Sequence, residues 1–117
     1  MNIQIYGTNK CFETKKAQRY FKERRIKFQF VDILKYPMSE GEFRNIKQAL
    51  KLPIKEMINE KSKDYEKSFI AYLANEDDIE DKLFENQSLF ITPIVRNGKQ
   101  ATIGFKADVW KEWEWWR

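Results

Sequence analysis

Residues 1–32 most strongly limit what this chain can fold into. Apolar residues alternate with polar ones from Ile3, and turn-forming residues follow from Gly7 to Asn9. Apolar residues then recur at helical spacing from Phe12 to about Arg25, and alternation returns over residues 26–33. A strand, a long helix and a second strand in so short a span predict a βαβ unit. Its two strands should be parallel and its crossover right-handed.

The only cysteine, Cys11, falls where this first helix is expected to begin. A sulfur at that position faces the unpaired amides of the first turn and the positive end of the helix dipole. Nearby lysines (Lys10, Lys15 and Lys16) should further favour the thiolate over the thiol. A lone cysteine is often just a small buried side chain, so that alternative stays open. The position itself favours a nucleophile.

Composition removes several classes of site. A chain of 117 residues predicts one domain, spanning 1–117. The absence of histidine excludes a Cys–His or Ser–His catalytic pair and a histidine-based metal site, so no metal ligands are assigned. One cysteine cannot form an internal disulfide, which is typical of a reducing, cytoplasmic setting. Apolar runs are too short for a membrane span, which needs roughly 20 residues. The net charge of +4 is spread among acids, so direct nucleic-acid binding is not expected.

The middle of the chain is expected to be helical. Pro37 interrupts the pattern after the second strand, and Ser39 with Glu42 forms a predicted capping box. Asp77 or Asp78 is a plausible cap for the last of these helices. The helices are expected over residues 39–52, 54–58, 65–74 and 78–84.

The last third of the chain predicts a hairpin followed by a helix. Asn97-Gly98 separates two apolar runs and is typical of a type I′ turn. Helical spacing resumes after Lys106, with Trp110 and Trp113 on one face that should cover the sheet. A βαβ unit joined to a ββα unit is the thioredoxin-like fold of the α/β class. Its core would be residues 1–36 and 88–117, with an all-helical insert at about 37–87.

Four segments carry a resemblance to a known family. They are Tyr6-Gly7-x-x-x-Cys11-x-x-x-Lys15-Lys16-Ala17, Pro53 to Lys67, Asn86 to Val95, and Ile103-Gly104-Phe105-x-x-x-x-Trp110. The first of these resembles the opening of the arsenate reductase-like (ArsC/Spx) family, a branch of the thioredoxin superfamily. The three later segments are similar to family segments in the same order, and the last is similar to the closing signature of the arsenate reductase-related branch.

The resemblance implies a set of site residues. Cys11 would be the catalytic nucleophile, with a cis bond before Pro93 that exposes the Thr92 main chain to a substrate thiol. Lys15 and Arg96 have a simpler interpretation as solvated side chains, and Thr14 as a residue that only satisfies main-chain amides. The candidate substrate- or thiol-binding residues are Asn9, Lys10, Thr14, Lys15, Asn59, Thr92, Pro93 and Arg96.

The sequence departs from the family at the positions that bind arsenate. Arsenate reductases of this family hold the oxyanion with arginines, one of them just before the cis-proline, where this chain has Thr92. Lys15 replaces a second arginine, and none is found near Asn59. Arsenate needs several bidentate donors, so we expect no arsenate reduction. Spx-type members often carry a second cysteine where this chain has Thr14, which excludes an internal redox switch.

The expected function is therefore that of a glutathione- or thiol-dependent reductase, monothiol and glutaredoxin-like. Its partners would be a small-molecule thiol and an oxidised substrate, with glutathione as co-substrate and no bound cofactor. The alternative is a non-catalytic, Spx-like module that binds RNA polymerase or another protein. Trp115 and Trp116 could then form part of a partner surface. A third alternative is a family member that keeps the fold and has lost activity.

Overall fold

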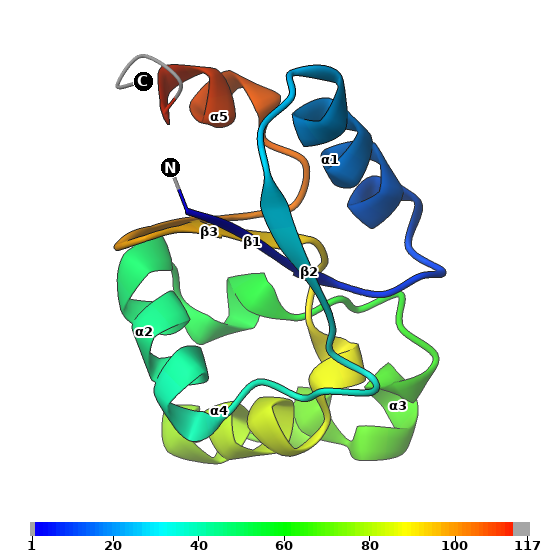
Figure 1. The fold of residues 1–117 in the computed structure, drawn as a ribbon. Coiled ribbons are helices and arrows are strands. Elements are labelled where there is room, and N and C mark those ends of the chain that lie inside the picture. The colour runs from blue at the N-terminus through cyan, green and yellow to red at the C-terminus, as the bar shows by residue number, and fades with distance from the viewer. Residues whose placement is uncertain (1, 114–117) are drawn as a thin grey trace.

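The computed structural model describes residues 2–113, and a four-stranded sheet of order β2-β1-β3-β4 lies at its centre (Figure 1). β1 and β2 are parallel, and β3 is antiparallel to both of its neighbours. This is the topology expected from a βαβ unit joined to a ββα unit. The strands are β1 (Ile3–Gly7), β2 (Phe28–Asp32), β3 (Ile94–Asn97) and β4 (Gln100–Ile103).

Helices cover both faces of the sheet (Figure 1). On one face lie α1 (Phe12–Glu23) and α5 (Ala107–Trp113), packed on Ile3, Ile5 and Val95. The segment between β2 and β3 packs on the other face, against Tyr6, Ile94 and Ile103. It consists of α2 (Glu40–Leu50), α3 (Asp64–Ser68), α4 (Glu76–Glu85) and the 3₁₀ turns Ile54–Met57, Ile70–Tyr72 and Gln87–Leu89.

The two faces follow from the alternation of the strands. Ile5 and Tyr6 are neighbours in β1 but belong to opposite clusters, and Ile94 and Val95 do the same in β3. The helical insert is thus an integral part of the fold. It supplies one of the two layers that keep the sheet away from water.

α1 begins as predicted and ends earlier than expected. Cys11 is its N-cap, and its inner face buries Thr14, Ala17, Tyr20 and Phe21. The helix stops at Glu23 rather than at Arg25, which has a positive φ of 56° and turns the chain toward β2.

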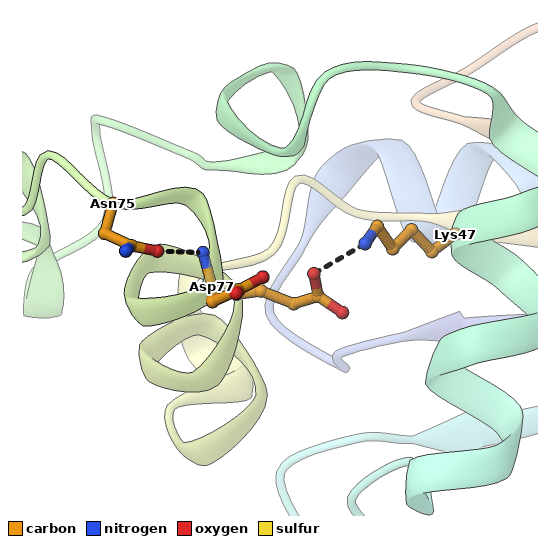
Figure 2. Close-up of polar contacts among 4 residues, drawn as sticks. Lys47, Asn75 and Asp77 are labelled. Atoms are coloured by element: carbon orange, nitrogen blue, oxygen red, sulfur yellow. Dashed lines mark hydrogen bonds and ion pairs between the residues drawn. The ribbon is translucent and has the colours of Figure 1, made fainter.

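The predicted capping box at the start of α2 is confirmed. The Ser39 hydroxyl accepts a hydrogen bond from the Glu42 amide at 3.2 Å, and the Glu42 carboxylate accepts one from the Ser39 amide at 3.0 Å. The predicted cap of α4 is wrong. Asn75, not an aspartate, accepts from the amide of Asp77 at 2.8 Å (Figure 2), so the helix starts at Glu76.

Two other predicted elements differ. The expected helix over 65–74 is broken at Phe69, whose φ of 59° separates α3 from a 3₁₀ turn. The hairpin turn falls on Gly98 and Lys99 rather than on Asn97-Gly98, because Asn97 pairs with Gln100 in the sheet. Only Gly98 has a positive φ (60°), which is typical of a type II′ turn rather than type I′. Asn97 stays in the strand because its side chain also accepts from the Asn2 amide.

The C-terminal helix completes the first layer. Trp110 and Trp113 are buried as predicted, and the Trp110 indole N–H donates to the Thr102 hydroxyl at 2.8 Å. Trp115 and Trp116 lie outside the described residues. Within residues 2–113, no helix combines the length and the apolar character that a bilayer crossing requires.

Candidate functional site

Cys11 lies where the loop after β1 enters α1. Its main chain is extended (φ −81°, ψ 119°), its amide donates to the Thr8 carbonyl at 3.3 Å, and its carbonyl accepts the first helical bond from Lys15. Its side chain is half-buried. The sulfur is therefore at the N-terminus of a twelve-residue helix and within reach of solvent.

The segment before β3 lies against this sulfur. The Thr92–Pro93 bond is cis, and the Cys11 thiol donates to the Thr92 carbonyl at 3.7 Å. The antiparallel pairing of Tyr6 with Ile94 explains the contact, because it sets the start of β3 beside the end of β1. Residues about 80 positions apart thus form one site.

Thr14 completes the immediate surroundings of the sulfur. It is 0 % exposed, and its hydroxyl has no hydrogen-bond partner among the described residues while Cys11 is a thiol. It nevertheless lies close enough to donate to the ionised sulfur. A buried hydroxyl without a partner costs free energy, and a hydrogen bond to the ionised sulfur would remove that cost.

Gly7 makes room for Thr14, a role that the sequence pattern did not predict. A Cβ at Gly7 would lie 2.4 Å from the Thr14 hydroxyl oxygen, so any larger residue would displace Thr14. Gly7 belongs to β1 and is buried, although the sequence predicted a turn residue. The only available signal was a glycine four positions before the cysteine.

Hydrogen bonds set the acidity of Cys11. Burial alone would raise the pKa of its thiol, but the hydroxyls of Thr14 and Thr92 and the amides of Thr14 and Glu13 outweigh burial. The pKa of Cys11 is therefore lower than its ordinary value. The lysines were expected to contribute to this acidity, yet hydroxyls and amides are the leading causes of the lowering.

The polar loop before Cys11 is anchored to β2. Asn9 donates to the Asp32 carboxylate at 3.4 Å, which joins the ends of β1 and β2 on the side of the sulfur. Lys10 and Lys15 are exposed and form no ion pair among the described residues. They contribute positive charge near the site but hold no fixed geometry.

Two predicted site residues form contacts with groups other than Cys11. Arg96 is three positions beyond Pro93, about 10 Å along the strand, near the Tyr6 hydroxyl and Glu42. Asn59 accepts from the Lys61 amide, and its own amide donates to the Leu89 carbonyl at 2.7 Å. A role of either residue at Cys11 stays a prediction.

The chain is similar to several known proteins. It is 24 % identical over 115 residues to "Uncharacterized protein YusI" of Bacillus subtilis, covering 96 % of this chain and 98 % of that one. It is 26 % identical over 113 residues to "Global transcriptional regulator Spx 2" of Oceanobacillus iheyensis, covering 92 % and 80 %. Among solved structures, arsenate reductase from Vibrio cholerae superposes with a TM-score of 0.84 at 23 % identity. The superposition covers 96 % of this chain and 97 % of that one.

The structural likeness at this identity establishes the thioredoxin-like fold. The family model for the ArsC family matches residues 6–113, nearly all of the described chain. The chain therefore belongs to the ArsC family.

Proposed function

We propose that this protein is a thiol-dependent reductase that uses Cys11 as its only nucleophile. The observation that carries the proposal is the half-buried Cys11 sulfur, set among donors that stabilise its ionised form. A thiolate, not a thiol, attacks disulfides, so a lowered pKa raises the reactive fraction at neutral pH. The protein would act in the cytoplasm with an external thiol such as glutathione as co-substrate and with no bound cofactor.

The reaction needs one protein thiol and two external thiols. The Cys11 thiolate attacks one sulfur of a disulfide; that S–S bond breaks, and the other sulfur leaves as a thiolate that takes a proton from water. Cys11 is then held in a mixed disulfide. An external thiolate attacks the second sulfur of that bond, which releases Cys11 as a thiolate and joins the external thiol to that sulfur. A second external thiolate then attacks the sulfur of the first, so the remaining substrate sulfur leaves as a thiol and the two external thiols, which have supplied two electrons, end as one disulfide.

Arsenate reduction is not part of the proposal. Thr92 and Lys15 occupy the two positions where the resemblance would place arginines near the sulfur, and Lys15 points to solvent. Neither side chain can form the planar, bidentate pairs that fix an oxyanion.

Mass spectrometry of the protein after incubation with oxidised glutathione tests the proposal. We expect one glutathione adduct on Cys11, released by added thiol, and none on the Cys11→Ser variant. Turnover would then be measured with a mixed disulfide as substrate and glutathione as reductant. Absence of the adduct at neutral pH would contradict the proposal.

A second candidate is a non-catalytic module that binds RNA polymerase. It is favoured by the similarity to a protein named as an Spx transcriptional regulator. The missing arsenate-binding arginines and the missing second cysteine also favour it, because both count against catalysis. This candidate predicts that Cys11→Ser protein still binds purified RNA polymerase with unchanged affinity. Absence of binding by the unaltered protein would exclude it.

A further inference from the structure

The outer face of α1 carries a stripe of positive charge. Lys15, Arg19 and Lys22 are exposed and are spaced at i, i+4 and i+7. With Gln18 they line a shallow depression of about 260 Å³. None of the three cations forms an ion pair among residues 2–113, and the neighbouring Glu13 is paired with Lys16 instead. We call these three side chains the α1 stripe.

The α1 stripe begins at the reactive sulfur. Cys11 precedes Lys15 by four residues, which places both on the same side of the helix, within about 40° of each other. From Cys11 to Lys22 the helix rises about 16 Å, at about 1.5 Å per residue. The hydroxyl of Thr14, buried and without a partner among the described residues, lies close enough to donate to the same sulfur once it is ionised. The stripe therefore starts one helical turn after a sulfur whose ionised form is stabilised.

Stability of the helix does not account for this arrangement. Like charges at i, i+4 destabilise a helix by a few tenths of a kcal/mol per pair. Glu13 is the acidic residue in the first turn, and it already contacts Lys16 at 3.9 Å. The charge of the α1 stripe is therefore available to a ligand.

We propose, on the basis of the proposed function, that the oxidised substrate of Cys11 is an acidic peptide segment of a partner protein. The segment would lie extended along the α1 stripe with its oxidised cysteine at Cys11. An extended chain advances about 3.3 Å per residue. Carboxylates about two, four and five residues from the substrate cysteine would then meet Lys15, Arg19 and Lys22 in turn. Exposed ion pairs of this kind act mainly by raising the rate of encounter.

A nucleic acid would match the charge but not the chemistry. The stripe holds three cations on a protein whose net charge is only +4, which is little for binding a phosphate backbone. The stripe also lies beside Cys11, whose proposed reaction is an exchange with the sulfur of a disulfide. A polypeptide with acidic residues beside a cysteine supplies both parts. The balance of the reaction is unchanged: Cys11 forms a disulfide with the peptide sulfur, one external thiol displaces Cys11 from it, and a second external thiol frees the peptide sulfur as a thiol.

Synthetic peptides test the proposal on the full chain. Each peptide carries one cysteine as a mixed disulfide with pyridine-2-thione, a neutral leaving group whose release is followed by absorbance. One pair of peptides has glutamates at the second, fourth and fifth positions after or before the cysteine, and a matched pair has glutamines there. We expect one acidic peptide to react about ten-fold faster than its neutral match at low salt. The advantage should fall toward one at 1 M salt, where the Debye length is about 3 Å.

Paired variants assign the effect to the stripe. In Arg19→Gln/Lys22→Gln, the ratio of acidic to neutral rates should fall to about one. The control variant is Lys63→Gln/Lys67→Gln, which removes two exposed lysines of the helical insert and should keep the ratio of the unaltered protein.

The outcomes separate this inference from the proposed function. Equal rates for acidic and neutral peptides with a reactive Cys11 would overturn the inference and leave the reductase intact. If no peptide releases pyridine-2-thione, the proposed reductase function is contradicted. Binding of the acidic segment is then tested separately, by fluorescence anisotropy of a labelled acidic peptide with Cys11→Ser protein. The inference would be overturned if the peptide did not bind, or if its binding were unaffected by Arg19→Gln/Lys22→Gln. Tighter binding of a single-stranded oligonucleotide at the same residues would overturn it in favour of nucleic acid.

Discussion

At the scale of single residues, the site is Cys11 with neighbouring hydroxyls and amides that stabilise its ionised form. The Thr92 carbonyl accepts from the thiol, while the hydroxyls of Thr14 and Thr92 can donate to the thiolate. Thr14 has no other partner among the described residues, so its hydrogen-bonding capacity is available to the sulfur.

Thr14→Val should raise the pKa of Cys11, because valine has nearly the same shape but cannot donate to the thiolate. The rate of alkylation by iodoacetamide as a function of pH measures that pKa. Thr14→Ser keeps the hydroxyl and should leave the pKa low. A Thr14→Val profile that matches that of the unaltered protein would contradict the role assigned to this hydroxyl.

Gly7→Ala should both destabilise the protein and raise the pKa of Cys11, because the added Cβ displaces Thr14. Overpacking at such a site costs about 1–3 kcal/mol, which urea denaturation would measure. Gly41→Ala is the matched control, since nothing lies within 4 Å of its added Cβ. Removing a glycine from within α2 should stabilise the protein by about 0.5–1 kcal/mol. Equal effects of the two changes would contradict the close packing at Gly7.

At the scale of elements, sequence patterns predicted the helices, strands and caps that depend on neighbouring residues alone. Periodicity located β1, α1 and β2, and the Ser39–Glu42 spacing predicted a cap that the structure contains. Sequence patterns gave a wrong position where contacts with distant residues determine the structure. Asn97 stays in its strand by pairing with Gln100 and with the Asn2 amide, so the turn shifts by one residue.

No sequence pattern predicted that the helix expected over 65–74 is interrupted at Phe69. An aromatic residue rarely adopts a positive φ, so the sequence favoured a continuous helix over 65–74. The cap of α4 was missed for a simpler reason. Asn75, Asp77 and Asp78 are all good capping residues, and the pattern did not distinguish among them.

Glu42 makes the start of α2 sensitive to pH. The Ser39 amide, together with the hydroxyls of Tyr6 and Ser39, holds the pKa of Glu42 below its ordinary value against the opposing effect of burial. A lowered pKa in the folded state means that the stabilisation is present above the ordinary glutamate pKa of about 4.3 and is lost as pH falls through the lowered value.

Glu42→Gln should therefore lower the free energy of unfolding by about 1 kcal/mol at pH 7, and the difference should vanish in acid. Urea denaturation between pH 3 and pH 7 measures this. Glu40→Gln is the control, because the exposed Glu40–Arg44 pair contributes little. A Glu42→Gln difference that stays constant across this pH range would contradict the account.

At the scale of the whole molecule, the helical insert and the sheet share one core. Met57 is fully buried in the cluster that contains Tyr6, Ile94 and Leu83, which come from two strands and from α4. The sequence predicted that residues 37–87 are helical, but not that they cover one face of the sheet. Such packing depends on contacts between distant segments, which periodicity does not report. The same limit applies to Arg96, whose place along β3 depends on strand register.

Met57→Ala should destabilise the whole chain by about 2–5 kcal/mol, because it leaves a cavity in this shared core. Tryptophan fluorescence reports the opposite layer through Trp110, and far-UV circular dichroism reports all helices. The two signals should keep a single, coincident transition. Tyr72→Ala, at a side chain that is 82 % exposed, should change stability by less than about 0.5 kcal/mol. A separate, earlier loss of helix in Met57→Ala would show that the insert unfolds by itself.

All chemistry proposed for the molecule depends on the ionisation of one sulfur, and the most direct test is the pH profile of Cys11 alkylation in the unaltered protein. Because this is the only cysteine, iodoacetamide incorporation followed by mass spectrometry reports it alone, with Cys11→Ser as the blank. We predict an inflection clearly below the value of about 8.5 for an unperturbed cysteine. An inflection at or above that value would contradict the account.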